Sequence, residues 1–406
     1  MCAGDEQKTD LLVVGGGPAG VMAGLLFARA GCQVCVLEKH GDFFRDFRGD
    51  TVHPSTMEVL DQLGLLKRFL QRPHNRLDRA ELRIAGRDWS IADLSHLQTP
   101  APFIAMMPQW DFLDFLRDEA ALYPGFHLEM SAPVASFMVE AGAVRGVRLA
   151  SGEERRARLV IAADGRSSLV RHERMLPLQV LGAPMDVLWF RVGKADDGGQ
   201  ALRGSFDAGR ILVLIDRGNY WQCAFVIPKG KAEAFTALGI DALKREIAKA
   251  ADDLDLSELD DIADLHLLSV ALDRLTRWHR PGLLAIGDAA HAMSPIGGIG
   301  INLAVQDAVA AANILAGPLA SGKDVEPLLQ EVQNRRWLPT RIIQSAQKLA
   351  QDRIIGPLLQ DSVPVARAPL AIRLLDRFPL LRRIPGRMIG LGIGRERVRS
   401  PNAYAG

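Results

Sequence analysis

Cysteine is scarce in this 406-residue sequence, which has only four, and its formal net charge is just +1. So few cysteines favour a reducing compartment, and the near-neutral charge argues against bulk nucleic-acid binding. We expect no apolar stretch long enough to span a bilayer, and therefore no transmembrane segment. The opening residues, MCAGDEQKTD, lack the apolar core and cleavage site of a secretory signal. We predict a cytoplasmic protein.

Metal-binding patterns are also missing from the sequence. No His, Cys and Asp residues stand at the spacing of a metal site. The acidic run DDLDLSELDDIADL at 252–265 lacks the central glycine and the ligand spacing of a calcium loop. We therefore predict no metal. Cys32 and Cys35 form a C-x-x-C pair that could be a redox couple, but QVCVLE favours a buried strand instead.

The first forty residues read as one βαβ unit. TDLLVV at 9–14 predicts a strand, VMAGLLFARA at 21–30 a helix, and QVCVLE at 33–38 a second strand. The length, about thirty residues, is that of a βαβ unit. Helices are expected to follow at 54–70 and 109–122.

From residue 186 the sequence pattern changes to a series of consecutive apolar strands. Before that point we expect three further strands, at 134–139, 144–149 and 158–163. From 186 to 227, apolar strands are joined by turns containing Gly and Asp. A helical stretch is predicted over 231–265, followed by the strand GLLAIGD and an Ala-rich helix from about residue 300. This order predicts an α/β protein with a sheet-rich lobe inserted into a discontinuous dinucleotide-binding domain.

Three glycines open the predicted first helix in the pattern G-x-G-x-x-G. Gly15 permits the tight turn, Gly17 lets a pyrophosphate approach the backbone, and Gly20 allows close packing of helix on strand. Glu38 ends the second strand, where an acid can accept hydrogen bonds from ribose hydroxyls. The candidate nucleotide-binding residues of this unit are Gly15, Gly17, Pro18, Ala19, Gly20, Glu38 and Lys39.

Two further motifs follow in the chain. DGRSSLVR supplies Asp164, Gly165, Ser168 and Arg171. GDAAHAMSPIGGIGIN supplies Gly287, Asp288, Pro295, Gly297, Gly298, Gly300, Ile301 and Asn302. The three motifs, in this order, resemble those of the class A flavin-dependent monooxygenases, the para-hydroxybenzoate hydroxylase-like family, over roughly residues 8–345.

The resemblance implies a GR2-like Rossmann domain for FAD, an inserted β-sheet-rich substrate domain and a C-terminal helical segment. The expected FAD-binding domain comprises 1–72, 102–175 and 276–345, the substrate domain 73–101 and 176–275, and the C-terminal segment 346–406. NAD(P)H serves such enzymes as a cosubstrate without a second Rossmann domain. The acid of the G-D motif, here Asp288, binds ribitol hydroxyls. The glycine loop and the helix from Ile301 then face the flavin ring and stabilise its anionic reduced form.

Several other positions match the family by location. Arg48 and Gly49 match an arginine segment at the FAD pyrophosphate, and Gln109 a polar contact at a helix start. Val134 matches a strand position beside adenine, and Ser168 with Arg171 could hold FAD or NAD(P)H. Each of these could instead be an ordinary surface or packing residue.

In the family, reduced FAD and O2 form a C4a-hydroperoxyflavin that hydroxylates an aromatic ring. Pro295 matches the proline near the reacting carbon. His53 and His291 are candidate proton carriers, although each could be a structural histidine. The candidate substrate residues are Trp189, Arg191, Tyr220 and Gln222. Alternation pairs Trp189 with Arg191 and Tyr220 with Gln222, but leaves open which face of the sheet is inward.

The predicted partners are a small aromatic or polycyclic substrate and O2, with no nucleic acid, for a monomer or homodimer. Residues 367–399 hold nine arginines and two acids among Leu, Ile and Pro. Peripheral contact with a membrane is one reading of this segment, but its prolines favour packing on the protein's own core. The alternative functions are an FAD-dependent reductase or oxidase on the same fold, or a catalytically idle flavin- or ligand-binding protein.

Overall fold

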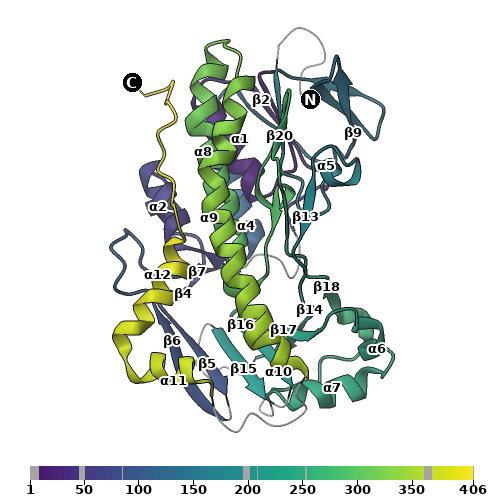
Figure 1. The fold of residues 1–406 in the computed structure, drawn as a ribbon, viewed down its shortest axis with the longest axis vertical. Coiled ribbons are helices and arrows are strands. Elements are labelled where there is room, and N and C mark those ends of the chain that lie inside the picture. The colour runs from purple at the N-terminus through teal and green to yellow at the C-terminus, as the bar shows by residue number, and fades with distance from the viewer. Residues whose placement is uncertain are drawn as a thin grey trace.

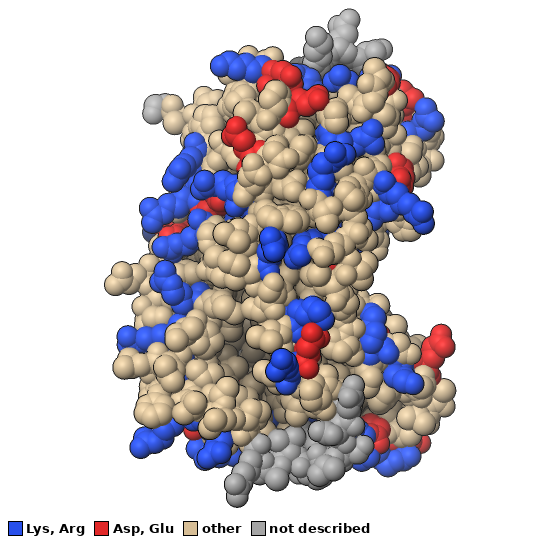
Figure 2. All heavy atoms as spheres, viewed as in Figure 1, with Lys and Arg blue, Asp and Glu red and all other residues tan. Residues whose placement is uncertain are grey.

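The chain has two lobes, with long helices running between them (Figure 1). This computed structural model describes residues 9–44, 51–84, 86–194, 202–207, 209–251, 254–360 and 368–405. One lobe holds α1 (Pro18–Arg29) and most of α8 (Gly300–Ala320), and α9 (Leu329–Ala350) extends from it toward the other. The molecule is indented along one edge between the two lobes (Figure 2).

The first lobe is built on a six-stranded sheet with the order β20-β21-β12-β1-β2-β8. The strands are β1 (Leu11–Val14), β2 (Val34–Leu37), β8 (Phe126–Glu129), β12 (Leu159–Ala162), β20 (His279–Arg280) and β21 (Leu283–Ala285). All neighbours pair in parallel except β20 with β21. The predicted βαβ unit is confirmed, and its two strands are buried because α1 packs against the sheet and apolar residues of the antiparallel segment 134–149 join the same cluster.

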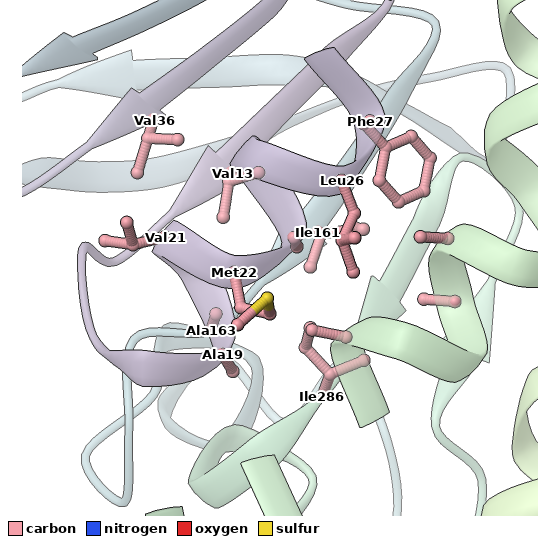
Figure 3. Close-up of a cluster of buried hydrophobic side chains, with 14 of the residues drawn as sticks. Val13, Ala19, Val21, Met22, Leu26, Phe27, Val36, Ile161, Ala163 and Ile286 are labelled. Carbon is pink, nitrogen blue, oxygen red and sulfur yellow. The ribbon is translucent and has the colours of Figure 1, made fainter. Parts of the chain in front are cut away.

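Helix α1 joins the sheet to α8 through the largest apolar cluster. Met22 of α1 and Ile286, which follows β21, point toward one another there, with Ile161 of β12 close by (Figure 3). Helix α4 (Gln109–Ala120), which begins at the predicted residue, packs against α1 in the same cluster. The core therefore fixes the sheet edge from which the functional loops emerge.

Shorter elements complete this lobe. One small sheet contains β3 (Thr51–Val52), β4 (Asn75–Leu77) and β7 (Ile104–Met106). A second contains β9 (Val134–Glu140), β10 (Ala143–Leu149) and β11 (Glu154–Arg156), and a third β13 (Leu178–Val180), β19 (Asp273–Leu275) and β22 (His291–Ala292). The short helices are α2 (Pro54–Gln62), α3 (Leu66–Phe69) and α5 (Leu169–His172).

The second lobe is a seven-stranded sheet with the order β18-β14-β17-β16-β15-β5-β6. Its strands are β5 (Arg79–Ile84), β6 (Arg87–Asp93), β14 (Met185–Gly193), β15 (Leu202–Asp207), β16 (Arg210–Asp216), β17 (Tyr220–Pro228) and β18 (His266–Leu268). One face is covered by α6 (Ala232–Thr236) and α7 (Ile240–Ala248). Two segments far apart in sequence thus share one sheet; the domain boundaries given above stay a prediction.

Two predicted helices differ from the observed ones. The expected helix at 54–70 is divided into α2 and α3, with Gly64 between them at φ +74°. The expected helix at 231–265 is divided into α6 and α7, and the described residues 254–261 beyond them are not helical. There Asp255 accepts a hydrogen bond from the Ser257 N–H at 2.9 Å, a local turn that competes with helical hydrogen bonding.

The C-terminal part of the chain runs from α9 through a π-helical turn at Gln351–Ile355 into α10 (Gly356–Gln360). Beyond it, α11 (Leu370–Arg377) and α12 (Arg383–Leu391) lie beside β6 (Figure 1). Single-turn 3-10 helices occur at Ile262–Asp264, Gly287–Ala289, Ile296–Gly298, Glu326–Leu328 and Pro379–Arg382.

One helix, Ile296–Ala320, is long and apolar enough to cross a membrane by length and composition. The expectation that no apolar stretch reaches that length was therefore wrong. However, 78% of its apolar window is buried inside the protein. A core helix of a soluble protein has the same composition, so the length alone is weak evidence for a span.

Candidate functional site

The three sequence motifs meet at the carboxyl edge of the six-stranded sheet. Gly15 follows β1, Glu38 follows β2, Asp164 lies just beyond β12, and Gly287 just beyond β21. A side-chain carbon added to Gly15 would lie 2.7 Å from the Asp164 Cα, and one added to Gly287 would lie 3.1 Å from the Ala19 Cβ. Ligands of open α/β sheets bind at this edge.

The glycine turn has the shape that a dinucleotide requires. Gly15 has φ +103°, and a Cβ there would collide with the Ala163 carbonyl oxygen at 2.5 Å. A Cβ on Gly20 would come within 1.9 Å of the Gly15 carbonyl oxygen, so only a glycine at this position lets the helix pack this closely on the turn. Around Gly17 no heavy atom of the described chain lies within 4 Å of such a carbon. That space, in front of the N-terminus of α1, fits a pyrophosphate.

Glu38 is held beside this turn. Its Oε2 accepts a hydrogen bond from the Gly16 N–H at 2.9 Å, and its Oε1 one from the His40 N–H at 3.1 Å. Pro18 begins α1, Ala19 is buried, and Lys39 is exposed. The structure thus places the predicted ribose acceptor next to the predicted pyrophosphate turn, while the side chain of Lys39 extends into solvent.

Asp164 and Ser168 organise the second motif. The Asp164 Oδ2 accepts a hydrogen bond from the Leu169 N–H at 2.9 Å, and Ser168 caps α5 by accepting one from the Val170 N–H. The Asp164 Oδ1 is buried without a donor among the described residues. Burial raises the pKa of Asp164. An oxygen in this state can accept a hydrogen bond from a bound hydroxyl group, while Gly165, with φ +82°, turns the chain beneath it.

Arg171 joins the second motif to the third. Its guanidinium donates to the Asp288 carbonyl at 2.6 Å and the Ala289 carbonyl at 3.0 Å, and pairs with Asp273 at 2.8 Å. These contacts fix the backbone of the G-D turn. The Asp288 carboxylate stays about one-third exposed, 3.6 Å from Arg166. The predicted role of Arg171 in direct cofactor binding stays a prediction.

The glycine loop between Pro295 and Gly300 is partly exposed, and hydrogen bonds from neighbouring side chains hold its backbone. Gly297 and Gly298 have φ +77° and +63°. The Thr51 hydroxyl donates to the Gly298 carbonyl at 3.1 Å, and the His53 Nε2 donates to the Gly297 carbonyl at 3.1 Å. Gly298 has no room for a Cβ, which would lie 2.4 Å from the Thr51 hydroxyl oxygen. The sequence predicted the loop but not the support that Thr51 gives it.

The first turn of α8 follows this loop. Gly300, Ile301 and Asn302 form that turn, where backbone N–H groups lack helical acceptors and the dipole is positive. The Asn302 Oδ1 accepts hydrogen bonds from the Ser55 and Thr56 hydroxyls at 2.6 and 2.9 Å. The side chain of Asn302 therefore anchors the helix start. The arrangement can stabilise negative charge that develops in front of α8.

His53 is completely buried, and burial lowers its pKa from the ordinary 6.5 to about 4. Because Nε2 faces a carbonyl oxygen, this nitrogen carries the proton. Its Nδ1 is buried without a partner among the described residues. The imidazole is therefore neutral at physiological pH and supports the loop; a role in proton transfer stays a prediction.

The pKa of His53 leads to a pH-dependent stability. Below pH 6.5 the unfolded chain binds a proton that the native protein accepts only near pH 4. Stability therefore falls as the pH drops through this window, by on the order of 3 kcal/mol. We expect His53→Gln, whose amide can still donate to the Gly297 carbonyl, to lose less thermal stability between pH 7 and pH 4.5. Parallel pH profiles of Tm for the two proteins would contradict this assignment.

His291, the second predicted histidine, lies in a buried ionic network that sequence reasoning missed. Its Nε2 is 2.6 Å from the Asp307 Oδ2, and Arg336 contacts the other oxygen of Asp307 at 2.9 Å. The Gly287 N–H also donates to Asp307, at 3.0 Å. Burial would raise the pKa of Asp307, but His291 and Arg336 outweigh it and hold that pKa below its ordinary value. The network therefore supports the G-D turn from beneath.

The predicted substrate residues share one face of the seven-stranded sheet. In the antiparallel register Arg191 is opposite Gln222, Gly193 opposite Tyr220, and Trp189 opposite Ala224. The other face is packed against α6 and α7. Trp189 and Ile296, the neighbour of Pro295, pack against the same apolar cluster. The four candidates thus lie on the face turned toward the glycine loop, which alternation alone could not decide.

The remaining predictions concern single positions. Gln109 begins α4, and Val134 begins β9, next to the segment whose Ala132 N–H donates to the Glu38 carbonyl. Arg48 and Gly49 lie outside the described residues. Cys32 is a free, buried thiol that donates to the Ala316 carbonyl, so it is not paired with Cys35.

Comparisons with known proteins agree with this geometry. Residues 8–346 match the family model described as FAD binding domain. The chain is 34% identical to 6-methylpretetramide 4-monooxygenase of Streptomyces rimosus, over 98% of this chain and 95% of that protein.

Two solved structures share the fold. The Diels-Alderase PyrE3 of pyrroindomycin biosynthesis superposes with a TM-score of 0.77 at 20% identity, over 96% of this chain and 82% of that one. The p-nitrophenol 4-monooxygenase PnpA of Pseudomonas putida DLL-E4 gives 0.74 at 20% identity, over 95% and 96%. The family match, the identity over nearly the full length and the converging motifs lead to one conclusion: the chain belongs to the FAD-binding family of class A aromatic monooxygenases.

Proposed function

We propose that the protein is an FAD-dependent monooxygenase that uses NAD(P)H and O2 to hydroxylate an aromatic or polycyclic small molecule. The observation that carries this proposal is the meeting of Gly17, Asp288 and the glycine loop at one sheet edge, opposite the face that holds Trp189. The relative named 6-methylpretetramide 4-monooxygenase supports a polycyclic substrate.

When bound, FAD supplies the oxygen-activating chemistry. The residues at the Gly15–Gly20 turn, Glu38 and Asp288 would hold it. The first turn of α8 places backbone N–H groups and a positive dipole where negative charge must be stabilised. The apolar side chains that pack with Trp189 would exclude water from a substrate bound on this face.

The fold alone does not fix the reaction, because a Diels-Alderase shares it. The test is to measure NAD(P)H oxidation and O2 uptake with phenols, quinolones and polycyclic polyketides. We expect one class to stimulate both rates together. NAD(P)H oxidation that needs a substrate but no O2 would favour the reductase. Absence of NAD(P)H oxidation with every compound would favour an idle binding protein.

We further propose that the protein works in the cytoplasm as a monomer or homodimer. Because the span-length helix found among the described residues is mostly buried, we expect any contact with a membrane to be peripheral.

A further inference from the structure

Helices α11 and α12 and the turn between them present large apolar side chains to solvent. Three of these side chains, Leu370, Leu380 and Ile384, are 66–69% exposed. The C-terminal apolar surface comprises Leu370, Leu374, Phe378, Leu380, Leu381, Ile384 and Met388. Monomeric soluble proteins rarely leave so many large apolar side chains exposed together, which marks a surface with a partner.

The packing of α12 explains why these side chains point outward. A Cβ on Gly386 would lie 2.0 Å from the Asp93 carbonyl oxygen, and one on Gly390 would lie 2.7 Å from a methyl carbon of Leu97. The helix therefore places its glycine face against β6 and the following loop. Ile384 and Met388 remain on the solvent side. The segment packs on the protein through the inner side of α12, the contact of α11 with β6 and the residues around Glu396, but its large apolar side chains on α11 and α12 face solvent.

Positive charge surrounds the apolar side chains. Residues 370–388 contain five arginines and one acid, although the chain as a whole carries a net charge of only +1. That acid, Asp376, is engaged by Arg87 and Arg382. Four arginines have no carboxylate partner within the described chain: Arg373, Arg377, Arg383 and Arg387. Figure 2 shows this corner, at the lower left, as tan with blue around it and almost no red.

We propose that the C-terminal apolar surface docks peripherally on an anionic lipid bilayer. Exposed leucine, isoleucine and phenylalanine side chains insert at the level of the headgroups, and the unpaired arginines bind the negative lipid phosphates around them. A second copy of this chain is a poorer occupant, because a symmetric pairing would bring the unpaired arginines of both copies together. An anionic bilayer matches both the apolar side chains and the charge.

Docking in this way brings the substrate face near the lipid. Ile389 and Leu391, on the inner side of α12, pack with the apolar cluster that Trp189 also contacts. Only α12 would then separate a lipophilic substrate in the bilayer from that apolar cluster. This consequence rests on the proposed function, whereas the docking itself does not.

The test is co-sedimentation of the purified full-length protein with vesicles, without substrate or NAD(P)H. We expect binding to phosphatidylcholine vesicles that contain phosphatidylserine, weaker binding as salt is added, and little binding to phosphatidylcholine alone. Two double variants separate the two contributions. Leu380→Ser with Ile384→Ser removes apolar side chains, and Arg383→Glu with Arg387→Glu reverses positive charges. Each should weaken binding by about 20-fold or more. All four positions are solvent-facing, so Tm should stay unchanged.

Matched controls lie elsewhere on the surface. Leu122→Ser removes an apolar side chain that is 68% exposed, and Lys67→Glu reverses an exposed charge; both should leave binding unchanged. Failure of the wild-type protein to bind anionic vesicles would overturn the proposal. So would equal binding by the double variants. Concentration-dependent dimerisation that these variants abolish, without vesicle binding, would instead assign the surface to a second copy.

Discussion

Gly17→Ala is expected to lower the affinity for FAD by about 100-fold while the flavin-free protein keeps its fold. The backbone at Gly17 has φ −74°, which alanine adopts freely, and no described atom lies near the added methyl group. That methyl group fills the space in front of α1. Losing hydrogen bonds to the pyrophosphate worth about 3 kcal/mol in total corresponds to about 100-fold in Kd.

Gly20→Ala is the matched variant in the same turn. Its Cβ would lie 1.9 Å from the Gly15 carbonyl oxygen, so the flavin-free protein itself should lose thermal stability. Titration of flavin-free protein with FAD and measurement of its Tm separate the two effects. Wild-type affinity in Gly17→Ala would show that the pyrophosphate binds elsewhere.

Arg336→Met is expected to destabilise the protein by about 3–5 kcal/mol, because it removes from the buried Asp307 the partner that is always charged. Asp307 and Arg336 are both essentially inaccessible, and their atoms lie 2.9 Å apart. Arg336 also donates to the Gly394 carbonyl at 2.9 Å, which ties the segment after α12 to α9. Urea unfolding of the FAD-saturated protein measures the change.

Lys348→Met is the control on the same helix. Lys348 pairs with Asp352 at 2.8 Å, but both side chains are more than 40% exposed. An exposed pair of this kind contributes at most about 0.5 kcal/mol. Equal effects of the two substitutions would mean that burial does not set the strength of the Asp307 network.

The parts of the site that the sequence predicted are those encoded within one short segment. The turn from Gly15 to Gly20 and the acid at Glu38 belong to a single βαβ unit, so their spacing alone constrains their geometry. The loop of Gly297 and Gly298 was recognisable in the same way, because consecutive residues with positive φ require glycine.

The supports of the site were not predictable, because their partners are distant in the chain and follow no spacing rule. Thr51 and Ser55 brace residues near 300, and Arg336 reaches Asp307 from a different helix. Only tertiary packing brings them together. A buried acid such as Asp307 in an Ala-rich apolar helix was the one signal that could have indicated a buried network.

Which face of the seven-stranded sheet is open to substrate could not be predicted from the sequence either. Alternation placed Trp189 and Arg191 on the same side of a strand, but only the register with β17 and the position of α7 show which side is covered. The direct contacts of the predicted site residues with flavin and substrate remain predictions.

The measurement that tests the central claim most directly is the mass of the product formed under ¹⁸O2 with NAD(P)H and a substrate that stimulates O2 uptake. Monooxygenation predicts one ¹⁸O atom in each product molecule and none from labelled water. A product that carries no oxygen from O2, formed at the same rate under nitrogen, would contradict the assignment.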